Sequence, residues 1–76
     1  MNQDDRKIVS KADEGIALHL AALEELADDM EQRIENILEY FPDGNQTSEQ
    51  LQEEVDQLRE VIGSIEMAKQ EMEVLV

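Results

Sequence analysis

His19 is the only histidine of the chain and the first residue to consider for catalysis or metal binding. On a helix, a side chain that shares a metal ion or a proton with it would lie three or four residues away. Those positions hold only glycine and apolar residues, namely Gly15, Ile16, Ala22 and Leu23. The chain has no cysteine, and no serine stands close enough for His19 to activate. We therefore expect no enzyme activity, no metal ion and no other cofactor.

The acidic segment after Pro42 is the second candidate, because calcium-binding loops also join two helices. A calcium loop that began at Asp43 would need glycine at its sixth position and a bidentate glutamate at its twelfth. Those positions hold Ser48 and Glu54, so only the glutamate matches. Phosphate-binding loops, nucleophile elbows and zinc motifs are also missing. The sequence predicts no ion site at this turn.

Apolar residues recur at alternating spacings of four and three on both sides of the turn. These spacings average close to the helical period, so they predict a narrow apolar stripe on each of two helices. The first stripe is Ile16, Leu20, Leu23, Ala27, Met30, Ile34, Ile37 and Phe41, and the second is Leu51, Val55, Leu58, Ile62 and Ile65. A short connection makes two long helices antiparallel neighbours. The predicted fold is all-α, an antiparallel two-helix hairpin that resembles a coiled coil.

The start of the first helix is the less defined boundary. Residues 1–10 are polar and either fray or extend that helix, while the hairpin itself is expected over residues 11–76. Ser10, with an acidic residue three positions later, resembles a capping box and favours a helix over about 11–41. An earlier start near Asp4 is the alternative.

The turn is marked by proline and by residues that favour turns. Pro42 ends the first helix, because proline lacks an amide proton and disfavours helical geometry in the residue before it. The turn is expected over 42–47. Thr47 and Gln50 form a capping box that predicts a second helix over about 48–75. Tyr40 and Phe41, beside the turn, are expected to close the end of the core.

The end of the hairpin that holds both termini, here called the open end, is apolar on more than one helical face. A helix that is apolar on several sides is usually buried on several sides. We therefore expect a homodimer with four-helix-bundle packing at this end. The residues predicted for that interface are Ile16, Leu18, Leu20, Ala22, Leu26, Val61, Ile65, Ala68 and Met72.

The charge is strongly unbalanced, with 20 acidic and 6 basic residues and a net charge of −14. Half of the basic residues, Arg6, Lys7 and Lys11, lie near the N-terminus. Such an acidic body repels nucleic-acid backbones and anionic membrane surfaces, so we expect it to bind neither directly. No apolar run approaches the roughly 18 residues of a transmembrane helix. The first residues lack the pattern of a signal peptide, so we expect a cytoplasmic protein.

The end of the hairpin at the turn, here called the acidic tip (residues 28–60), holds eleven acidic and two basic residues. One interpretation is a solvated face that keeps the protein in solution. The other is a surface that recognises a basic protein partner. The residues predicted to contact that partner are Asp28, Asp29, Glu31, Glu35, Tyr40, Glu53, Glu54, Asp56 and Glu60.

Small size, an all-helical chain and extreme acidity together resemble phage-encoded DNA-mimic inhibitors. That resemblance implies a module that engages a basic partner surface, such as one that binds nucleic acid, and inhibits or regulates the partner. In length and hairpin form the chain is also similar to the small subunit of bacterial exonuclease VII. The alternative function is a structural subunit or adaptor, held in a larger helical assembly through its apolar open end.

Overall fold

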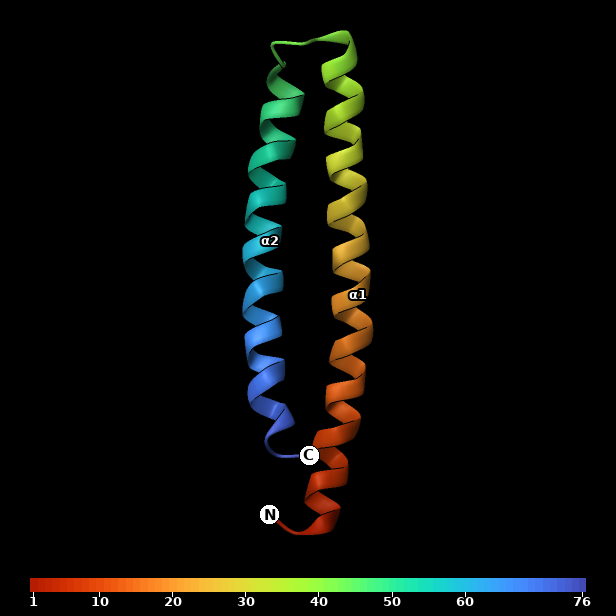
Figure 1. The fold of residues 1–76 in the computed structure, drawn as a ribbon, viewed down its shortest axis with the longest axis vertical. Coiled ribbons are helices and arrows are strands. Elements are labelled where there is room, and N and C mark those ends of the chain that lie inside the picture. The colour runs from red at the N-terminus through yellow and green to blue at the C-terminus, as the bar shows by residue number, and fades with distance from the viewer.

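The structure, a computed structural model, describes residues 1–76 as two helices joined by a short turn. Helix α1 spans Gln3–Tyr40 and helix α2 spans Gln46–Glu73. The helices lie antiparallel and side by side in a rod with extents of 58 × 15 × 12 Å (Figure 1). The predicted all-α two-helix hairpin is confirmed. Neither helix has an apolar stretch long enough to cross a membrane.

Helix α1 begins close to the earlier of the two expected starts. Asn2 caps it, because its Oδ1 accepts a hydrogen bond from the amide of Asp5 at 2.8 Å. Asp5 Oδ2 accepts one in return from the amide of Asn2 at 3.3 Å. This reciprocal pair satisfies two amides that the first turn leaves free. Ser10 therefore lies inside α1 and does not mark its start.

Helix α2 begins earlier than expected, and its cap is a different residue. Asn45 Oδ1 accepts a hydrogen bond from the amide of Ser48, and Ser48 Oγ accepts one from the amide of Asn45, both at 2.8 Å. The prediction that Thr47 caps this helix is wrong, because Asn45 supplies the same type of bonds two residues earlier. Gly44, with φ +82°, turns the chain toward this cap. A Cβ there would lie 3.1 Å from Ser48 Oγ.

The core follows the two predicted stripes. Its buried apolar members are Ala27, Met30, Ile34, Val55 and Ile62, and the other stripe residues except Phe41 are half-buried. Phe41 is 54% exposed, because it is the C-cap of α1 and its backbone (φ −132°, ψ 77°) leaves the helical register. The expectation that Tyr40 and Phe41 close the core is wrong. Ser48, 4% exposed, lies buried near the turn instead.

The two helices differ in length, with 38 residues in α1 and 28 in α2. The N-terminal end of α1 therefore extends past the last residues of α2 (Figure 1). Arg6 Nη1 donates a hydrogen bond to the carbonyl oxygen of Leu75 at 3.1 Å, which holds the C-terminal residues against α1. Ile8, on this projecting end, is 70% exposed.

Candidate functional site

The seam between the two helices has two edges with different chemistry. Residues one position after or before the stripe residues flank such a seam, as the e and g positions do in a coiled coil. The first edge, here called the charged edge, holds Glu24, Glu31, Gln52, Arg59, Glu66 and Glu73, with the apolar Ala17 and Leu38 in the same register. The second, here called the apolar edge, holds Ala12, His19, Leu26, Val61, Ala68 and Leu75 toward the open end, and Arg33 and Glu54 near the turn.

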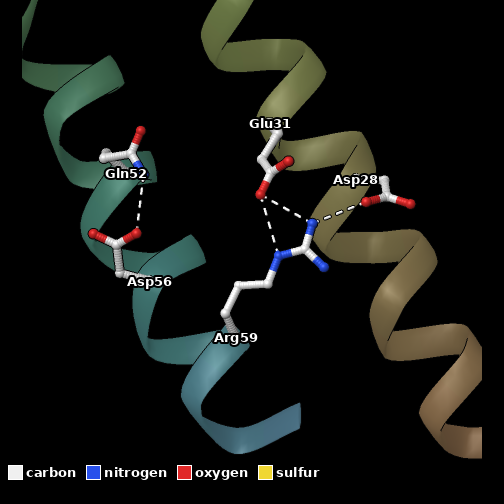
Figure 2. Close-up of polar contacts among 5 residues, drawn as sticks. All are labelled: Asp28, Glu31, Gln52, Asp56 and Arg59. Carbon is white, nitrogen blue, oxygen red and sulfur yellow. Dashed lines mark hydrogen bonds and ion pairs between the residues drawn. The ribbon is translucent and has the colours of Figure 1, made fainter. Parts of the chain in front are cut away.

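Arg59 joins α2 to α1 across the charged edge (Figure 2). Its Nη2 lies 2.9 Å from both Asp28 Oδ1 and Glu31 Oε1, and its Nε donates to the same Glu31 oxygen at 3.2 Å. The hydrogen bond with Asp28, followed by the one with Glu31, raises the pKa of Arg59 above its ordinary value. One guanidinium thus binds two of the acids predicted to contact a partner.

A carboxyl pair lies farther along the charged edge. The pKa of Glu24 is raised above its ordinary value of 4.5, chiefly by a hydrogen bond with Glu66. Loss of hydration and repulsion from Glu66 and Asp28 act in the same direction. Two carboxyl groups share a hydrogen bond only while one of them holds a proton. The contact between the two acids is therefore favourable only while Glu24 holds its proton.

A second cross-helix pair lies at the open end. Lys69 Nζ lies 3.4 Å from Asp13 Oδ2 and 2.8 Å from Glu73 Oε1. The hydrogen bond with Glu73 is the larger cause of a raised Lys69 pKa, and the one with Asp13 adds to it. This pair was not predicted from the sequence. The available signal was that Lys69 follows Ile65 by four residues, so a lysine occupies the apolar register of α2.

Four carboxylates form a line on the outer face of α2, here called the acidic stripe. Its members, at spacings of four, three and four, are Glu49, Glu53, Asp56 and Glu60, all exposed. This line spans about 16 Å at a rise of 1.5 Å per residue. No lysine or arginine forms an ion pair with any of them. Asp56 accepts a hydrogen bond from Gln52 at 3.0 Å (Figure 2).

All nine residues predicted to contact a partner are exposed, but they fall into two groups. The first group is engaged within the chain, since Asp28 and Glu31 bind Arg59, and Asp29 lies 3.2 Å from Arg33. The second group has no ion pair and comprises Glu35, Glu53, Glu54, Asp56 and Glu60, together with the uncharged Tyr40. Glu49 lies with Glu53, Asp56 and Glu60 on the acidic stripe but was not among the predicted contact residues. Its spacing of four residues from Glu53 was the signal that could have identified it.

The residues predicted for the oligomer interface also divide into two groups. Half-buried positions within the seam of the single hairpin are occupied by Ile16, Leu20, Ile65 and Met72. The remaining residues are exposed, namely Leu18, Ala22, Leu26, Val61 and Ala68. Of the exposed group, Leu26 and Val61 lie on the apolar edge, 44% and 46% exposed.

No group of three or more His, Asp or Glu side chains is arranged to hold a metal ion. His19 is exposed on α1 and forms no ion pair with any acid. No protein-family profile matches the chain, and no curated protein or solved structure matches it either. The candidate functional features of the structure are two surfaces, the acidic stripe and the apolar edge.

Proposed function

We propose that the chain is an acidic protein-binding module whose acidic stripe docks on a basic surface of another protein and regulates or inhibits it. The observation that supports this proposal is the line of four exposed carboxylates that form no ion pair. Carboxylates that already bind an arginine, such as Asp28 and Glu31, have less to gain from a partner. The acidic stripe retains its full negative charge for recognition.

The acidic stripe presents a line of negative charge to a partner that otherwise binds nucleic acid, although its charges are farther apart than those of a DNA strand. Its four charges are spread over about 16 Å of one rigid helix, and one DNA strand carries a charge every 3.4 Å or so. Because α2 is already ordered, little conformational entropy is lost when the surface docks. A negative line of this kind speeds association with a basic groove and competes with the nucleic acid for it.

We also infer that two hairpins associate into a homodimer with four-helix-bundle packing. Leu18, Leu26 and Val61 support this inference, because they are 75%, 44% and 46% exposed on a single hairpin. The same exposed residues favour a second candidate function, a structural subunit or adaptor within a larger helical assembly. Binding through apolar residues depends little on salt, whereas binding through the acidic stripe weakens as salt rises. Salt dependence therefore separates the two functions.

The test compares two variants that lose the same charge from different places. The stripe variant replaces each residue of the acidic stripe with glutamine. The control variant replaces four exposed acids outside the stripe with glutamine, namely Glu14, Glu25, Glu39 and Glu71. Proteins captured by the unmodified chain are identified by mass spectrometry, and their affinity for each variant is measured at several salt concentrations.

We expect a captured basic protein to bind the stripe variant at least tenfold more weakly than it binds the unmodified chain. Its affinity for the control variant should be unchanged. Double-stranded DNA or RNA should displace the chain from that partner. Equal losses for both variants would show that only net charge matters and would refute a role for the acidic stripe. Binding that is insensitive to salt and to both variants would favour the structural-subunit function.

A further inference from the structure

We propose that the apolar edge is the docking surface for a second copy of this chain, and that the two copies pack antiparallel. In that arrangement the N-terminal end of one copy, which holds Arg6, Lys7 and Lys11, lies beside the acidic tip of the other. This inference deepens the proposed dimer and rests on it. Beyond the dimer itself, it specifies the edge that the second copy covers, the relative direction of the two copies and the surfaces that remain free.

The position of the apolar edge follows from a groove near the turn. Arg33 and Ile37 of α1 line this groove together with Thr47, Leu51 and Glu54 of α2. The groove therefore lies along the seam on the side away from Arg59, which bonds to α1 across the charged edge. Arg33 and Glu54 are its outer members, one position before stripe residues.

Steps of seven residues extend the apolar edge from this groove toward the open end, because seven residues make almost two whole helical turns. One step from Arg33 reaches Leu26, and one step from Glu54 reaches Val61. A further step along α2 reaches Ala68. Leu26 and Val61 therefore flank the same seam from opposite helices, and both are nearly half exposed.

The chemistry of the two edges selects the apolar edge as the interface. Arg59 binds acids of α1 across the charged edge, whereas no ion pair crosses the apolar edge. Arg33 pairs only with Asp29 of its own helix. Around Leu26 and Val61 the neighbours on this side are small, since Ala22 and Ala68 occupy the adjacent turns. Small side chains let another helix approach closely.

Charge decides the direction of the second copy. The open end (residues 1–14 and 66–76) holds four basic and seven acidic residues, with Arg6, Lys7 and Lys11 among the bases, so it is much less acidic than the tip with its eleven acids and two bases. Copies that packed tip to tip would place two acidic tips together, which costs free energy through repulsion. Copies that pack antiparallel place each acidic tip beside the less acidic open end of the other copy, and this lower repulsion favours the antiparallel dimer.

The spacing along α1 fits this arrangement. A twofold axis at the level of Leu26 and Val61 relates residues that are equally far from Leu26 along α1 in opposite directions. Ala12, which lies on the apolar edge, is fourteen residues before Leu26, and Tyr40 is fourteen residues after it. Ala12 of one copy thus lies beside Tyr40 of the other. Tyr40 is 81% exposed in the single hairpin, so the second copy would cover it.

Two consequences connect this dimer to the proposed function. Glu49, Glu53 and Asp56 of the acidic stripe stay free in the dimer, whereas Glu60 borders the interface, because it lines the same surface hollow as Val61 and Ala68. The two acidic tips point in opposite directions. One dimer would therefore present two acidic stripes at its two ends and could bridge two basic partners.

The first test asks whether the apolar edge forms the interface. Val61→Glu places a charge on the apolar edge, and Met67→Glu makes the same type of change on the outer face of α2, where Met67 is 68% exposed. Sedimentation equilibrium should show the unmodified chain and Met67→Glu at twice the 8.7 kDa of one chain. Val61→Glu should be a monomer that keeps its helical circular dichroism. A dimer that withstands Val61→Glu would overturn the assigned edge.

The second test asks about direction, and it exploits the absence of cysteine from the chain. Ala12→Cys and Tyr40→Cys are prepared separately, mixed and oxidised. The antiparallel dimer should give a disulfide between the two different variants, and little between two copies of Tyr40→Cys. Spin labels on Glu39→Cys should lie about 40 Å or more apart, given the helical rise of 1.5 Å per residue.

The outcomes separate this inference from the proposed function. A Tyr40→Cys homodimer that forms readily, or a label distance under about 25 Å, would show tip-to-tip packing and overturn the antiparallel arrangement while leaving the dimer. A chain that stays monomeric at tens of micromolar would overturn both the arrangement and the dimer. Neither result touches partner binding by the acidic stripe, which the matched charge variants test.

Discussion

Lys69 Nζ lies 3.4 Å from Asp13 Oδ2, and both residues occupy positions in the seam where apolar side chains would continue the two stripes. Their side chains are only 21% and 16% exposed. The other carboxylate oxygen of Asp13 is buried without a hydrogen-bond partner. A polar pair inside a coiled-coil seam penalises other alignments of the helices, because any shift leaves a buried charge unpaired. We infer that this pair fixes the register of the hairpin at its open end.

Lys69→Met should therefore lower the melting temperature, because it leaves Asp13 without its cation in the seam. Asp13→Leu combined with Lys69→Met should recover the melting temperature of the unmodified chain or exceed it, since an apolar pair of similar volume needs no partner. Glu73→Gln is the control, because it removes only the exposed contact that Lys69 makes within α2. The melting temperatures of Lys69→Met, the double variant and Glu73→Gln are measured by thermal unfolding followed by circular dichroism. A double variant less stable than either single variant would contradict the argument.

The raised pKa of Glu24 predicts how stability depends on pH. Because Glu24 binds its proton more tightly in the folded chain, its stabilising contribution is complete below the ordinary value of 4.5. That contribution is lost as pH rises through the folded pKa, after which Glu24 and Glu66 repel each other. Glu24→Gln keeps a hydrogen-bond donor to Glu66 at every pH. Glu24→Gln should raise the melting temperature at pH 7. It should also reduce the fall in melting temperature that begins as the pH rises above the ordinary pKa of 4.5.

The matched control for this effect is Glu25→Gln, which removes the same charge from the neighbouring exposed position. Melting temperatures measured from pH 4 to pH 8 should separate the two variants. Equal changes at pH 7 would show that only net charge matters and that the contact with Glu66 does not.

The sequence predicted the core well because helical periodicity is a property of the chain alone. Ala27 and Val55 were placed in the two stripes by spacing, and both are almost completely buried. Phe41 was assigned wrongly by the same rule, because spacing carries no information about where the helix stops. The turn raised a similar problem. Asn45 and Thr47 both have capping side chains, and the choice depends on the backbone path through Gly44.

The acidic tip was also foreseen, but its internal pairing was not. Twenty acidic residues predict an acidic surface. Which of them contact Arg59, however, depends on how α2 is aligned with α1. That alignment is a tertiary property, and it brings Arg59 to Asp28 and Glu31 over sequence separations of 31 and 28 residues. The difference between the two edges of the seam follows from the same alignment. For this reason the residues predicted to contact a partner include both acids that form ion pairs within the chain and acids that do not.

The glycines should respond to alanine in opposite directions. A Cβ at Gly15 or Gly63 would meet nothing within 4 Å, and both residues are inside helices. Gly15→Ala and Gly63→Ala should each stabilise the chain by about 1 kcal/mol, through the higher helix propensity of alanine. Gly44→Ala should destabilise it, because Gly44 has φ +82° and its new Cβ would crowd Ser48. Urea unfolding at constant protein concentration gives these differences, and a stable Gly44→Ala would contradict the description of the turn.

Salt should stabilise the folded chain, because unpaired carboxylates such as Glu49, Glu53 and Glu60 repel one another on α2. The screening length falls from about 30 Å at 0.01 M to about 10 Å at 0.1 M, so the melting temperature should rise within that range. The stripe variant, with glutamine at all four positions, should melt higher at low salt and respond less to added salt. The control variant with four other glutamines should respond between the two, since its acids are more scattered. A melting temperature that stays flat or falls with salt in the unmodified chain would show that the ion pairs of Arg59 outweigh the repulsion along the acidic stripe.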